Sequence, residues 1–463
     1  MNSKYIELRN KYEEFRYNSF NIEEIENDLV ITYDFEIVGL THFNPKWVLK
    51  RPQDFSFAKQ KEIIENLVFN LGMVEIVSYL KCVCSKKLIV ACKGLTDEQK
   101  LWWKKLYING LGEFFYVNNI AEEMNIDTFL EIECEKPVDL KNYALNYSLD
   151  GNLIPIGGGK DSLVTLDALK VQKDKNTCYV VNSRGATKDS ILASGYNENS
   201  TYEAKRYLDQ RLIDLNKQGF LNGHTPFSAI LAFSSYIVAV MMKKKYIVLS
   251  NEASANESNV EGTNINHQYS KSTEFEKDFR EYSQKYLINN GPEYFSLLRP
   301  LTEWQIVCAF AKLDKYFKVF KSCNVGSKTD IWCEKCPKCL YVYLMLNGFL
   351  KEEQMKEIFN TNMLEDEENI ALFEGLIYPD KDKPFECVGT KEEINLCINM
   401  AIERLEKENK DLPYLYKKYK GRIENLEEEL EKAKQHWNED NFLPIEFEKI
   451  LKSYIGGNIE TEN

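Results

Sequence analysis

The chain has 463 residues, which is too long for one ordinary hydrophobic core and predicts two or three domains. Hydrophobic residues make up 44% and aromatic residues 13% of the sequence, as in folded globular proteins. The net charge of −13 disfavours nucleic acid as the main partner, because contacts to phosphates require a basic surface. We therefore expect no nucleic-acid partner, with a local basic groove for tRNA as the alternative.

The lack of a secretory signal, together with the cysteine content, favours a cytoplasmic protein without membrane contact. Residues 1–7 lack the apolar stretch of a secretory signal. The longest apolar run, residues 227–242, is shorter than the roughly 20 residues of a membrane span and predicts a buried helix. The 12 cysteines, without a targeting signal, indicate a reducing compartment, where clustered cysteines usually bind metal.

Residues 1–145 predict an N-terminal α+β domain, a candidate for substrate recognition. Leu29–Phe35 is rich in β-branched and aromatic residues and predicts a strand. Thr96 and Gln99 have the spacing of a capping box, which predicts a helix from this point to about Gly110.

Residues 146–345 predict a parallel sheet covered by helices on both faces. Apolar segments at 153–156, 178–181 and 246–249 are separated by helical patterns. Each segment ends in polar residues: a glycine loop, Asn182, and Ser250 to Glu252. Because ligands collect at the carboxyl ends of parallel strands, we expect these residues to meet in one crevice.

The glycine loop comprises Gly157, Gly158, Gly159, Lys160, Asp161 and Ser162, between an apolar run and an amphipathic one at 163–169. A glycine-rich turn at a helix start presents backbone N–H groups and the positive end of the helix dipole, which suits a phosphate. The loop fits neither G-x-x-x-x-G-K-[ST] nor G-x-G-x-x-G. It resembles the S-G-G-x-D-S pyrophosphate loop (PP-loop) of N-type ATP pyrophosphatases, with Gly157 in place of serine. A plain turn is the alternative.

Four cysteines predict a structural zinc site. Cys333, Cys336 and Cys339 form a C-x2-C-x2-C motif, and Cys323 lies ten residues upstream. An iron–sulfur cluster and a set of free buried thiols are the alternatives. Together with the glycine loop, the cysteines also resemble the zinc site of 7-cyano-7-deazaguanine synthases.

After residue 346 the sequence predicts an acidic helical C-terminal region, 346–463. One apolar stripe in it recurs at steps of three and four and predicts a packed or partner-binding helix, compatible with a homodimer. The stripe consists of Leu415, Tyr419, Ile423, Leu426, Leu430, Ala433 and Trp437.

Three further segments sharpen the resemblance: NGHTP at 222–226, LSNEASA at 249–255 and VEGTNINHQYSKS at 260–272. With the glycine loop and the cysteines, they resemble the UDP-N-acetylmuramoyl-L-alanyl-L-glutamate epimerase family (MurL). The resemblance is strongest from about 150 to 345, weaker at 71–79 and at Trp102 and Trp103, and without a recognisable motif after about 400. Gly157 is the residue expected in that family.

The resemblance implies an α/β fold with a central PP-loop domain of the adenine nucleotide α-hydrolase type. It implies an ATP- and Mg²⁺-dependent isomerase of peptidoglycan biosynthesis. The terminal L-glutamate of UDP-MurNAc-L-Ala-L-Glu would be adenylated on its α-carboxylate and inverted, with release of AMP and pyrophosphate. Lys160 and the loop amides would hold phosphate charge, Asp161 would reach the metal, Ser162 a phosphate oxygen, and Asn182 adenine. A strand-end cap is the alternative for Asn182.

Four residues are candidates for transferring the proton. His267 leads because imidazole titrates near neutral pH and because its segment has no apolar periodicity. Glu252 and Lys271 are alternative bases or charge partners. His224 precedes Thr225 and Pro226, a predicted N-cap and first helical residue, so it contributes to the site or orients that helix.

Two residues are candidates for substrate binding, Arg299 and Asn251. The guanidinium of Arg299 is able to grip a carboxylate or diphosphate, with a surface ion pair as the alternative. Two other functions stay open at this point. One is a synthetase of the deazaguanine type, and the other is an ATP-binding module without turnover.

Overall fold

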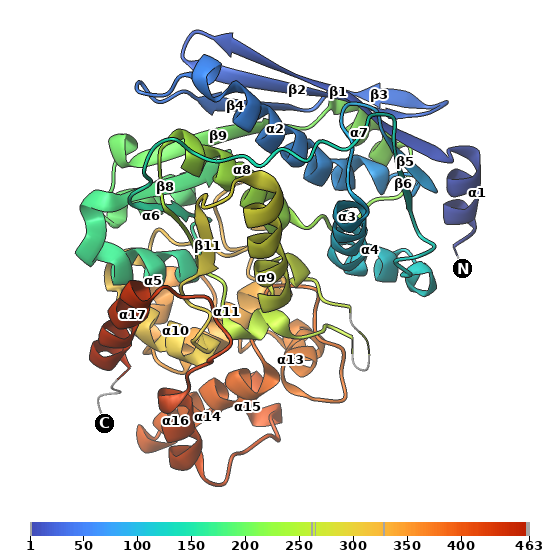
Figure 1. The fold of residues 1–463 in the computed structure, drawn as a ribbon. Helices are drawn as coiled ribbons and strands as arrows, with labels where there is room; N and C mark the ends of the chain where they lie inside the picture. Colours follow the sequence, from blue (N-terminus) through green and yellow to red (C-terminus); the bar gives the residue numbers. More distant parts are fainter. Residues whose placement is uncertain (1, 261–262, 264, 327–328, 460–463) are drawn as a thin grey trace. The chain divides into compact units, whose positions relative to one another are not determined.

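The computed structural model describes residues 2–260, 263, 265–326 and 329–459 (Figure 1). Its backbone contacts define two compact units, each assembled from segments that are distant in the sequence. Unit 1 comprises residues 1–153, 202–247 and 263–294, and unit 2 comprises 154–201, 248–262 and 295–463. These interleaved units differ from the three consecutive regions expected from the sequence.

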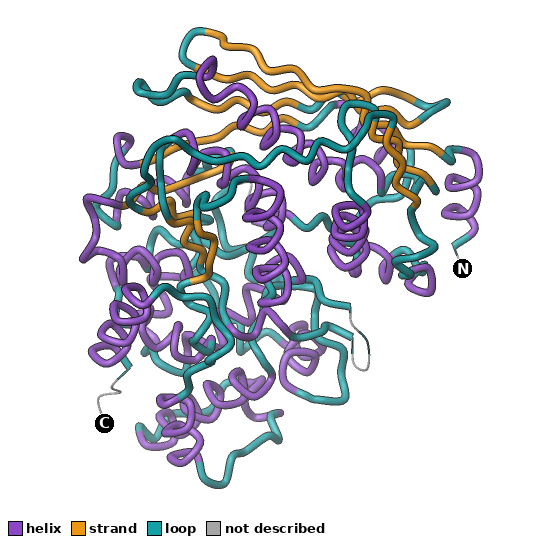
Figure 2. Tube along the Cα trace, viewed as in Figure 1, coloured by secondary structure: helices purple, strands orange, loops and turns teal. Residues whose placement is uncertain are grey.

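Unit 1 contains an antiparallel layer of long strands. Strand β2 (Asp28–Ile37) pairs with β1 (Glu14–Ile25), β3 (Thr41–Phe43) and β4 (Lys46–Lys50), all antiparallel. Every second residue of β2 is buried, as the predicted strand at Leu29–Phe35 requires. Strand β5 (Lys87–Val90) pairs in parallel with both β1 and β6 (Glu131–Cys134). Figure 2 shows these strands in orange.

The remaining strands are β7 (Asn152–Pro155), β8 (Asn176–Val181), β9 (Thr201–Tyr207), β10 (Tyr246–Leu249) and β11 (Glu293–Ser296). The 11-stranded sheet has the order β11-β10-β7-β8-β9-β4-β2-β1-β5-β6, with β3 against β2. Strands β7 and β10 pair in parallel, so the predicted parallel arrangement is confirmed for them. The predicted α/β class is correct, and the sheet as a whole is mixed.

The helices of unit 1 include two apolar ones, α2 (Phe57–Leu80) and α8 (Phe227–Met241), which contact each other. Helix α2 also lies against β1 and β2 (Figure 1). By length and composition α2 is able to cross a membrane, but 89% of its most apolar window is buried in the protein. The other helices are α1 (Ser3–Lys11), α3 (Asp97–Gly110), α4 (Gly112–Val117), α7 (Gln210–Lys217) and α9 (Thr273–Tyr282).

Two predicted helix starts in unit 1 have different outcomes. Thr96 and Gln99 form the capping box of α3, as predicted. The prediction for α8 was wrong, because its N-cap is Pro226 and no side chain caps it. The hydroxyl of Thr225 instead accepts a hydrogen bond from the Lys81 ammonium at 2.6 Å.

Helices and loops make up most of unit 2, and its C-terminal part is helical as predicted (Figure 2). The helices before residue 350 are α5 (Lys160–Ala168), α6 (Gly185–Ala193), α10 (Glu303–Ala311) and α11 (Pro337–Asn347). Those that follow are α12 (Glu352–Ile358), α13 (Ile370–Ile377), α14 (Lys391–Lys407), α15 (Tyr414–Lys418), α16 (Leu426–Gln435) and α17 (Ile445–Asn458).

The apolar stripe predicted at 415–437 is not one helix. Leu415 lies in α15, and α16, which buries none of its residues, holds three more of the stripe residues. The other three, Tyr419, Ile423 and Trp437, lie outside both helices. The buried amide of Asn399 explains the break, since it donates to the Tyr419 hydroxyl and to Gly421 O and accepts from Ile423 N. These bonds hold the backbone after Tyr419 in an extended form and replace the hydrogen bonds of a helix.

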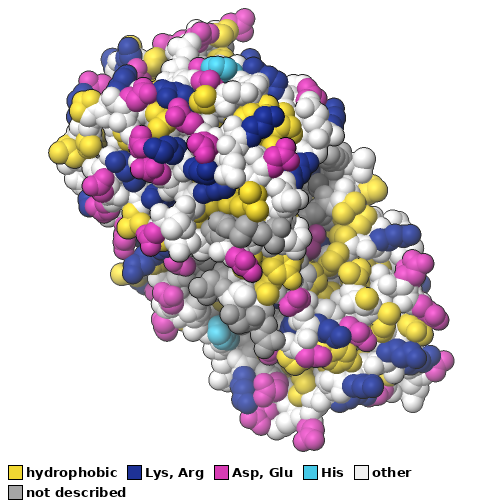
Figure 3. Space-filling model, turned by 90° about the vertical axis from the view of Figure 1, so that its right-hand side faces the viewer, with side chains coloured by type: hydrophobic (Ala, Val, Ile, Leu, Met, Phe, Trp, Pro, Cys, Tyr) yellow, Lys and Arg dark blue, Asp and Glu magenta, His cyan; other side chains and the backbone are white. Residues whose placement is uncertain are grey.

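Acidic and basic side chains are interspersed over the face shown in Figure 3.

Candidate functional site

The glycine loop lies in unit 2, between β7 and α5, as the sequence predicts. Gly158 has φ +85°, a conformation that side chains disfavour, and a Cβ there would lie 3.2 Å from the Thr187 backbone. A Cβ on Gly157 would meet no atom within 4 Å. The loop therefore requires glycine at position 158 for both its conformation and its close packing.

Helix α5 begins within this loop, at Lys160, and its N-cap is Gly159, which has no side chain to bond the first amides. The Ser162 hydroxyl donates to Gly159 O at 2.9 Å. Helix α6 differs, because its Gly185 and Ala186 amides each donate to the Asp330 carboxylate at 3.1 Å. A carboxylate thus already serves the start of α6, and the start of α5 is the better place for a phosphate in unit 2.

Lys160 is 1% exposed, and its ammonium binds two carboxylates, those of Asp161 and Glu303. The distance from Nζ to Glu303 Oε2 is 2.6 Å. Burial by itself lowers the pKa of Lys160, but Asp161, Glu303 and Glu252 more than offset this and raise it. Burial raises the pKa of the Glu303 carboxyl, against the effect of Lys160. Lys160 is therefore a fixed positive charge within an excess of carboxylates.

Glu393 joins the N-termini of two helices. Its carboxylate accepts from Thr390 N in the capping box of α14, and from Glu303 N and Trp304 N at the start of α10. Although part of the residue reaches the surface, burial raises the pKa of this carboxyl to about 7. The Thr390–Glu393 spacing is a capping-box signal, but the contact to α10 has no sequence signature.

Arg299 is fully buried, so the alternative of a surface ion pair is wrong. Its Nη1 donates to Glu252 O at 2.7 Å, just after β10. Asn251 donates to the Ser296 hydroxyl at 3.0 Å. Asn182 follows β8 and has φ +50°. The polar ends of β10 and β11 are thus tied together, with Glu252 close enough to Lys160 to affect its pKa.

The four predicted metal-binding cysteines come together in unit 2, with all four sulfur atoms within 4.8 Å of one another. The Sγ–Sγ distances are 3.5 Å for Cys336–Cys339, 3.7 Å for Cys333–Cys339 and 3.9 Å for Cys323–Cys336. Tetrahedral zinc with Zn–S bonds of about 2.3 Å places its sulfurs about 3.8 Å apart. The geometry fits such an ion.

A second group of candidate site residues lies in unit 1, around Glu113 on α4. Glu113 Oε2 is 2.5 Å from His267 Nδ1 and 3.4 Å from His224 Nδ1. The two imidazole centroids are 4.3 Å apart. Burial, followed by the charges of His267, Lys81 and Lys271, lowers the pKa of His224 to about 3. His224 is therefore neutral at physiological pH.

Lys81, at the end of α2, holds the segment that carries His224. Its ammonium donates to Gly223 O and to the Thr225 hydroxyl, the latter at 2.6 Å. Burial lowers the pKa of Lys81 to about 8. Lys271 ends a short 3₁₀ helix at Tyr269–Lys271. The predicted residues His224, His267 and Lys271 therefore belong to one cluster, whereas Glu252 belongs to the Lys160 cluster of unit 2.

Comparison with known proteins identifies the family of this chain. The MurL N-terminal domain matches residues 7–297, and the MurL C-terminal domain matches 319–433. The chain belongs to the MurL family. The C-terminal match extends past residue 400, where the sequence shows no recognisable motif.

Three relatives are named UDP-N-acetyl-alpha-D-muramoyl-L-alanyl-L-glutamate epimerase. The protein of a Micromonospora species is 33% identical, covering 76% of this chain and 77% of its own length. That of Salinispora tropica is 33% identical, covering 76% of each chain. That of Xanthomonas oryzae pv. oryzae is 31% identical, covering 73% of this chain and 74% of its own. These relatives are isomerases by name.

The motif segments of this MurL-family chain lie within the matched ranges, but Glu261, Gly262 and Asn264 lie outside the described residues. Sequence reasoning missed Glu113, Lys81, Glu303 and Glu393. Glu113 is 154 residues from His267 in the sequence, and Glu303 is 143 residues from Lys160. Pairs this distant leave no spacing pattern, so only the fold identifies them.

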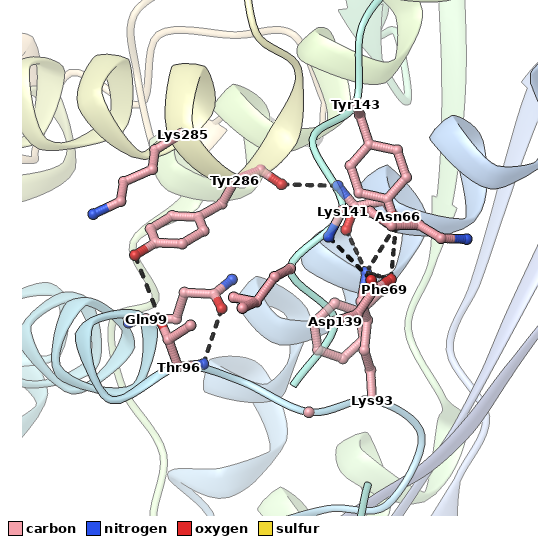
Figure 4. A pocket seen from close by; sticks show the side chains of 12 residues that line it. Asn66, Phe69, Lys93, Thr96, Gln99, Asp139, Lys141, Tyr143, Lys285 and Tyr286 are labelled. Carbon is pink, nitrogen blue, oxygen red and sulfur yellow. Dashed lines mark hydrogen bonds and ion pairs between the residues drawn. The ribbon is translucent and has the colours of Figure 1, made fainter. Parts of the chain in front are cut away.

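Unit 1 also contains a cavity of about 170 Å³, seen in Figure 4. Three of its lining residues are lysines, and each ammonium has a carboxylate within 4.0 Å: Asp139 for Lys93, Glu62 for Lys141 and Glu98 for Lys285. These ion pairs neutralise the positive charge, so the cavity offers no cationic site for a phosphate.

Proposed function

We propose that this MurL-family chain is an ATP-dependent epimerase acting on UDP-MurNAc-L-Ala-L-Glu. The three relatives carry the name of that activity, and membership of the family makes the chain an epimerase, an enzyme of the isomerase class. The use of ATP is supported by one observation above all. The positive-φ turn at Gly158 leads into the start of α5, an arrangement that would bind a phosphate as a PP-loop does.

ATP has a chemical purpose in this isomerisation. The α-proton of a carboxylate is hard to remove, because the product would hold two negative charges next to each other. We infer that an α-carboxylate oxygen attacks the α-phosphorus of ATP, the bond to the β-phosphate breaks, and pyrophosphate leaves. In the resulting mixed anhydride the α-proton is removed and the electron pair is delocalised onto the carbonyl. Reprotonation from the other face inverts the centre, and water then releases AMP.

Unit 2 supplies the groups for the ATP step. The amides at Gly157–Ser162 would hold phosphate oxygens, and Asn182 would contact adenine. Lys160 would supply positive charge as pyrophosphate departs. Mg²⁺ would neutralise phosphate charge when bound. Asp161 would reach this ion, because 31% of its side chain is accessible. Arg299 and Asn251 would contribute to substrate binding by holding the segment after β10 in place.

Unit 1 supplies the best groups for proton transfer. His267 is paired with a carboxylate, and His224 is neutral, so both imidazoles suit the transfer of a proton at neutral pH. Lys271 provides a positive charge nearby. Glu252 is the weakest candidate base. Its carbonyl oxygen accepts from Arg299, and its carboxylate lies close enough to Lys160 to raise the pKa of that lysine.

The four cysteines would hold a structural zinc ion, as their sulfur distances support. All four ligand positions would be protein thiolates, so this ion would stabilise the segment from Cys323 to α11 without taking part in the chemistry.

The same cysteines also favour a second candidate function, a synthetase of the 7-cyano-7-deazaguanine type, which would use ammonia on an acyl-adenylate. One assay separates the candidates. The protein is incubated with UDP-MurNAc-L-Ala-L-Glu, ATP and Mg²⁺ in D₂O. We expect AMP release together with deuterium at the glutamate α-carbon. AMP without deuterium would refute epimerisation of this substrate, and no AMP with any candidate acid would indicate an ATP-binding module.

A further inference from the structure

The Glu113 carboxylate lies within 3.4 Å of both the His224 and the His267 imidazoles, and neither sequence motif nor family name assigns it a role. Its side chain is 18% exposed, that of His267 is 12% and that of His224 is 21%. A carboxylate this far from solvent requires hydrogen-bond partners. Glu113 Oε2 has one in His267 Nδ1, at 2.5 Å.

The geometry distinguishes a hydrogen bond from metal ligation. Nitrogen and oxygen ligands of a zinc ion lie about 2.0–2.2 Å from the metal, so two of them are roughly 3.0–3.5 Å apart. The Glu113–His267 separation of 2.5 Å is shorter than that, so these two atoms share a hydrogen bond. The Glu113–His224 separation of 3.4 Å lies within that range for two metal ligands but is long for a hydrogen bond, so His267 is the hydrogen-bond partner of Glu113.

We propose that Glu113 is the positioning residue of His267: it accepts the Nδ1–H, fixes that tautomer, and makes Nε2 the atom that receives the α-proton. The inference rests on the proposed epimerase function. A neutral imidazole carries one N–H, so a carboxylate at Nδ1 requires the lone pair to be at Nε2. The same carboxylate then stabilises the imidazolium that forms, as in other carboxylate–histidine pairs.

The proton balance of the step is simple. The α-C–H bond of the adenylated glutamate breaks, its electron pair stays on the substrate as an enolate, and the proton moves to His267 Nε2. The imidazolium formed keeps its Nδ1–H on Glu113 without transferring it. Because His224 is neutral, it adds no positive charge beside the imidazolium that forms on His267.

The tautomer is measurable without any catalysis. The chain has four histidines, so ¹⁵N spectra of histidine-labelled protein resolve each ring. We expect the Nδ1–H tautomer for His267 in the wild type and its loss in Glu113→Leu. A matched control is Asp34→Leu beside the exposed His42, whose Nδ1 lies 2.9 Å from Asp34 Oδ1. This control should change the His42 signal and leave His267 unchanged. An Nε2–H tautomer of His267 in the wild type would overturn the proposal.

Kinetics provide the second test, with Glu113→Gln as an isosteric variant in case Glu113→Leu does not fold. We expect deuterium incorporation per AMP released to fall about 10–100-fold in Glu113→Gln and to recover partly in Glu113→Asp. An unchanged ratio would refute the positioning role. Loss of one equivalent of bound metal in Glu113→Gln would also refute it and would indicate a metal site. If the wild type releases no AMP, the proposed function fails, while the tautomer measurement still decides the role of Glu113.

Discussion

The Glu113–His267 pair of unit 1 and the Glu303–Lys160 pair of unit 2 both join a carboxylate to a basic group, yet they are suited to different tasks. Lys160 and Glu303 are 1% and 2% exposed, and the neighbouring carboxylates raise the pKa of Lys160. His267 is partly exposed, and its neighbour His224 is neutral. The Lys160–Glu303 pair holds a permanent charge, whereas the Glu113–His267 pair would gain and lose a proton in the proposed reaction. Burial and local charge, rather than residue type, make this difference.

The largest effect is expected when the proton-transfer group itself is removed. His267→Asn should lower deuterium incorporation at the glutamate α-carbon by about 10²–10⁴-fold, because general base catalysis typically contributes this much. AMP release should fall much less, since it depends on unit 2. Mass spectrometry of the product and an AMP assay measure the two. His42→Asn, at an exposed histidine, is the control. Equal losses in both assays would contradict the division of tasks between the units.

The fixed charge of unit 2 is tested through stability. Lys160→Met should destabilise the fold by about 3–5 kcal/mol, because it leaves Glu303 buried without its cation. This cost should shrink as the pH falls, since Glu303 then takes up a proton and becomes neutral. Urea unfolding at several pH values measures both effects.

Lys81→Met is the matched control for Lys160→Met. Lys81 is also buried, but its ammonium donates to two backbone carbonyls and a hydroxyl rather than to a carboxylate. Its removal should therefore cost only about 1–2 kcal/mol. Similar costs for the two variants would show that the Lys160–Glu303 ion pair has no special role in stability.

The neutral state of His224 predicts how unit 1 responds to acid. Its pKa is about 3 in the folded protein and near 6.5 in the unfolded chain. Between these values the unfolded chain binds a proton that the folded protein does not, so stability falls as the pH falls from 6.5 towards 3. The neighbours Glu113, His267, Lys81 and Lys271 are the same in wild type and variant.

His224→Gln removes this titration. Between pH 6.5 and pH 5, the wild type should lose about 1 kcal/mol per pH unit more than the variant, measured by urea unfolding. Parallel pH profiles of the two proteins would show that His224 is charged in the folded state.

The sequence predicted the local parts of both clusters better than their assembly. The strand, loop and helix around Gly158 were correct, because glycine spacing and apolar runs are local signals. His267 was proposed because its polar segment has no apolar periodicity, and His224 because it precedes the predicted helix start at Thr225 and Pro226. Glu113 lies in the short helix α4, between Gly112 and two buried phenylalanines, and nothing near it indicates catalysis.

The wrong predictions have a common physical cause, which is a distant hydrogen bond that overrides a local pattern. Asn399 interrupts the apolar stripe after Tyr419, and Lys81 takes the hydroxyl of Thr225 that was expected to cap α8. Arg299 was weighed as a surface residue but is buried against Glu252 O. Tertiary contacts of this kind have no periodicity in the sequence.

The smallest effect concerns the rigidity of the loop in unit 2, for which two neighbouring glycines form a matched pair. Gly158→Ala should lower the free energy of unfolding by about 1–2 kcal/mol, because its φ of +85° strains any side chain and a Cβ would press on the Thr187 backbone. Gly157→Ala should leave stability unchanged within about 0.5 kcal/mol, because a Cβ there meets no atom within 4 Å. Urea unfolding of both variants measures the difference. Equal stability would mean that the loop adjusts freely, and the contrast between a fixed site in unit 2 and a titrating site in unit 1 would lose its structural basis.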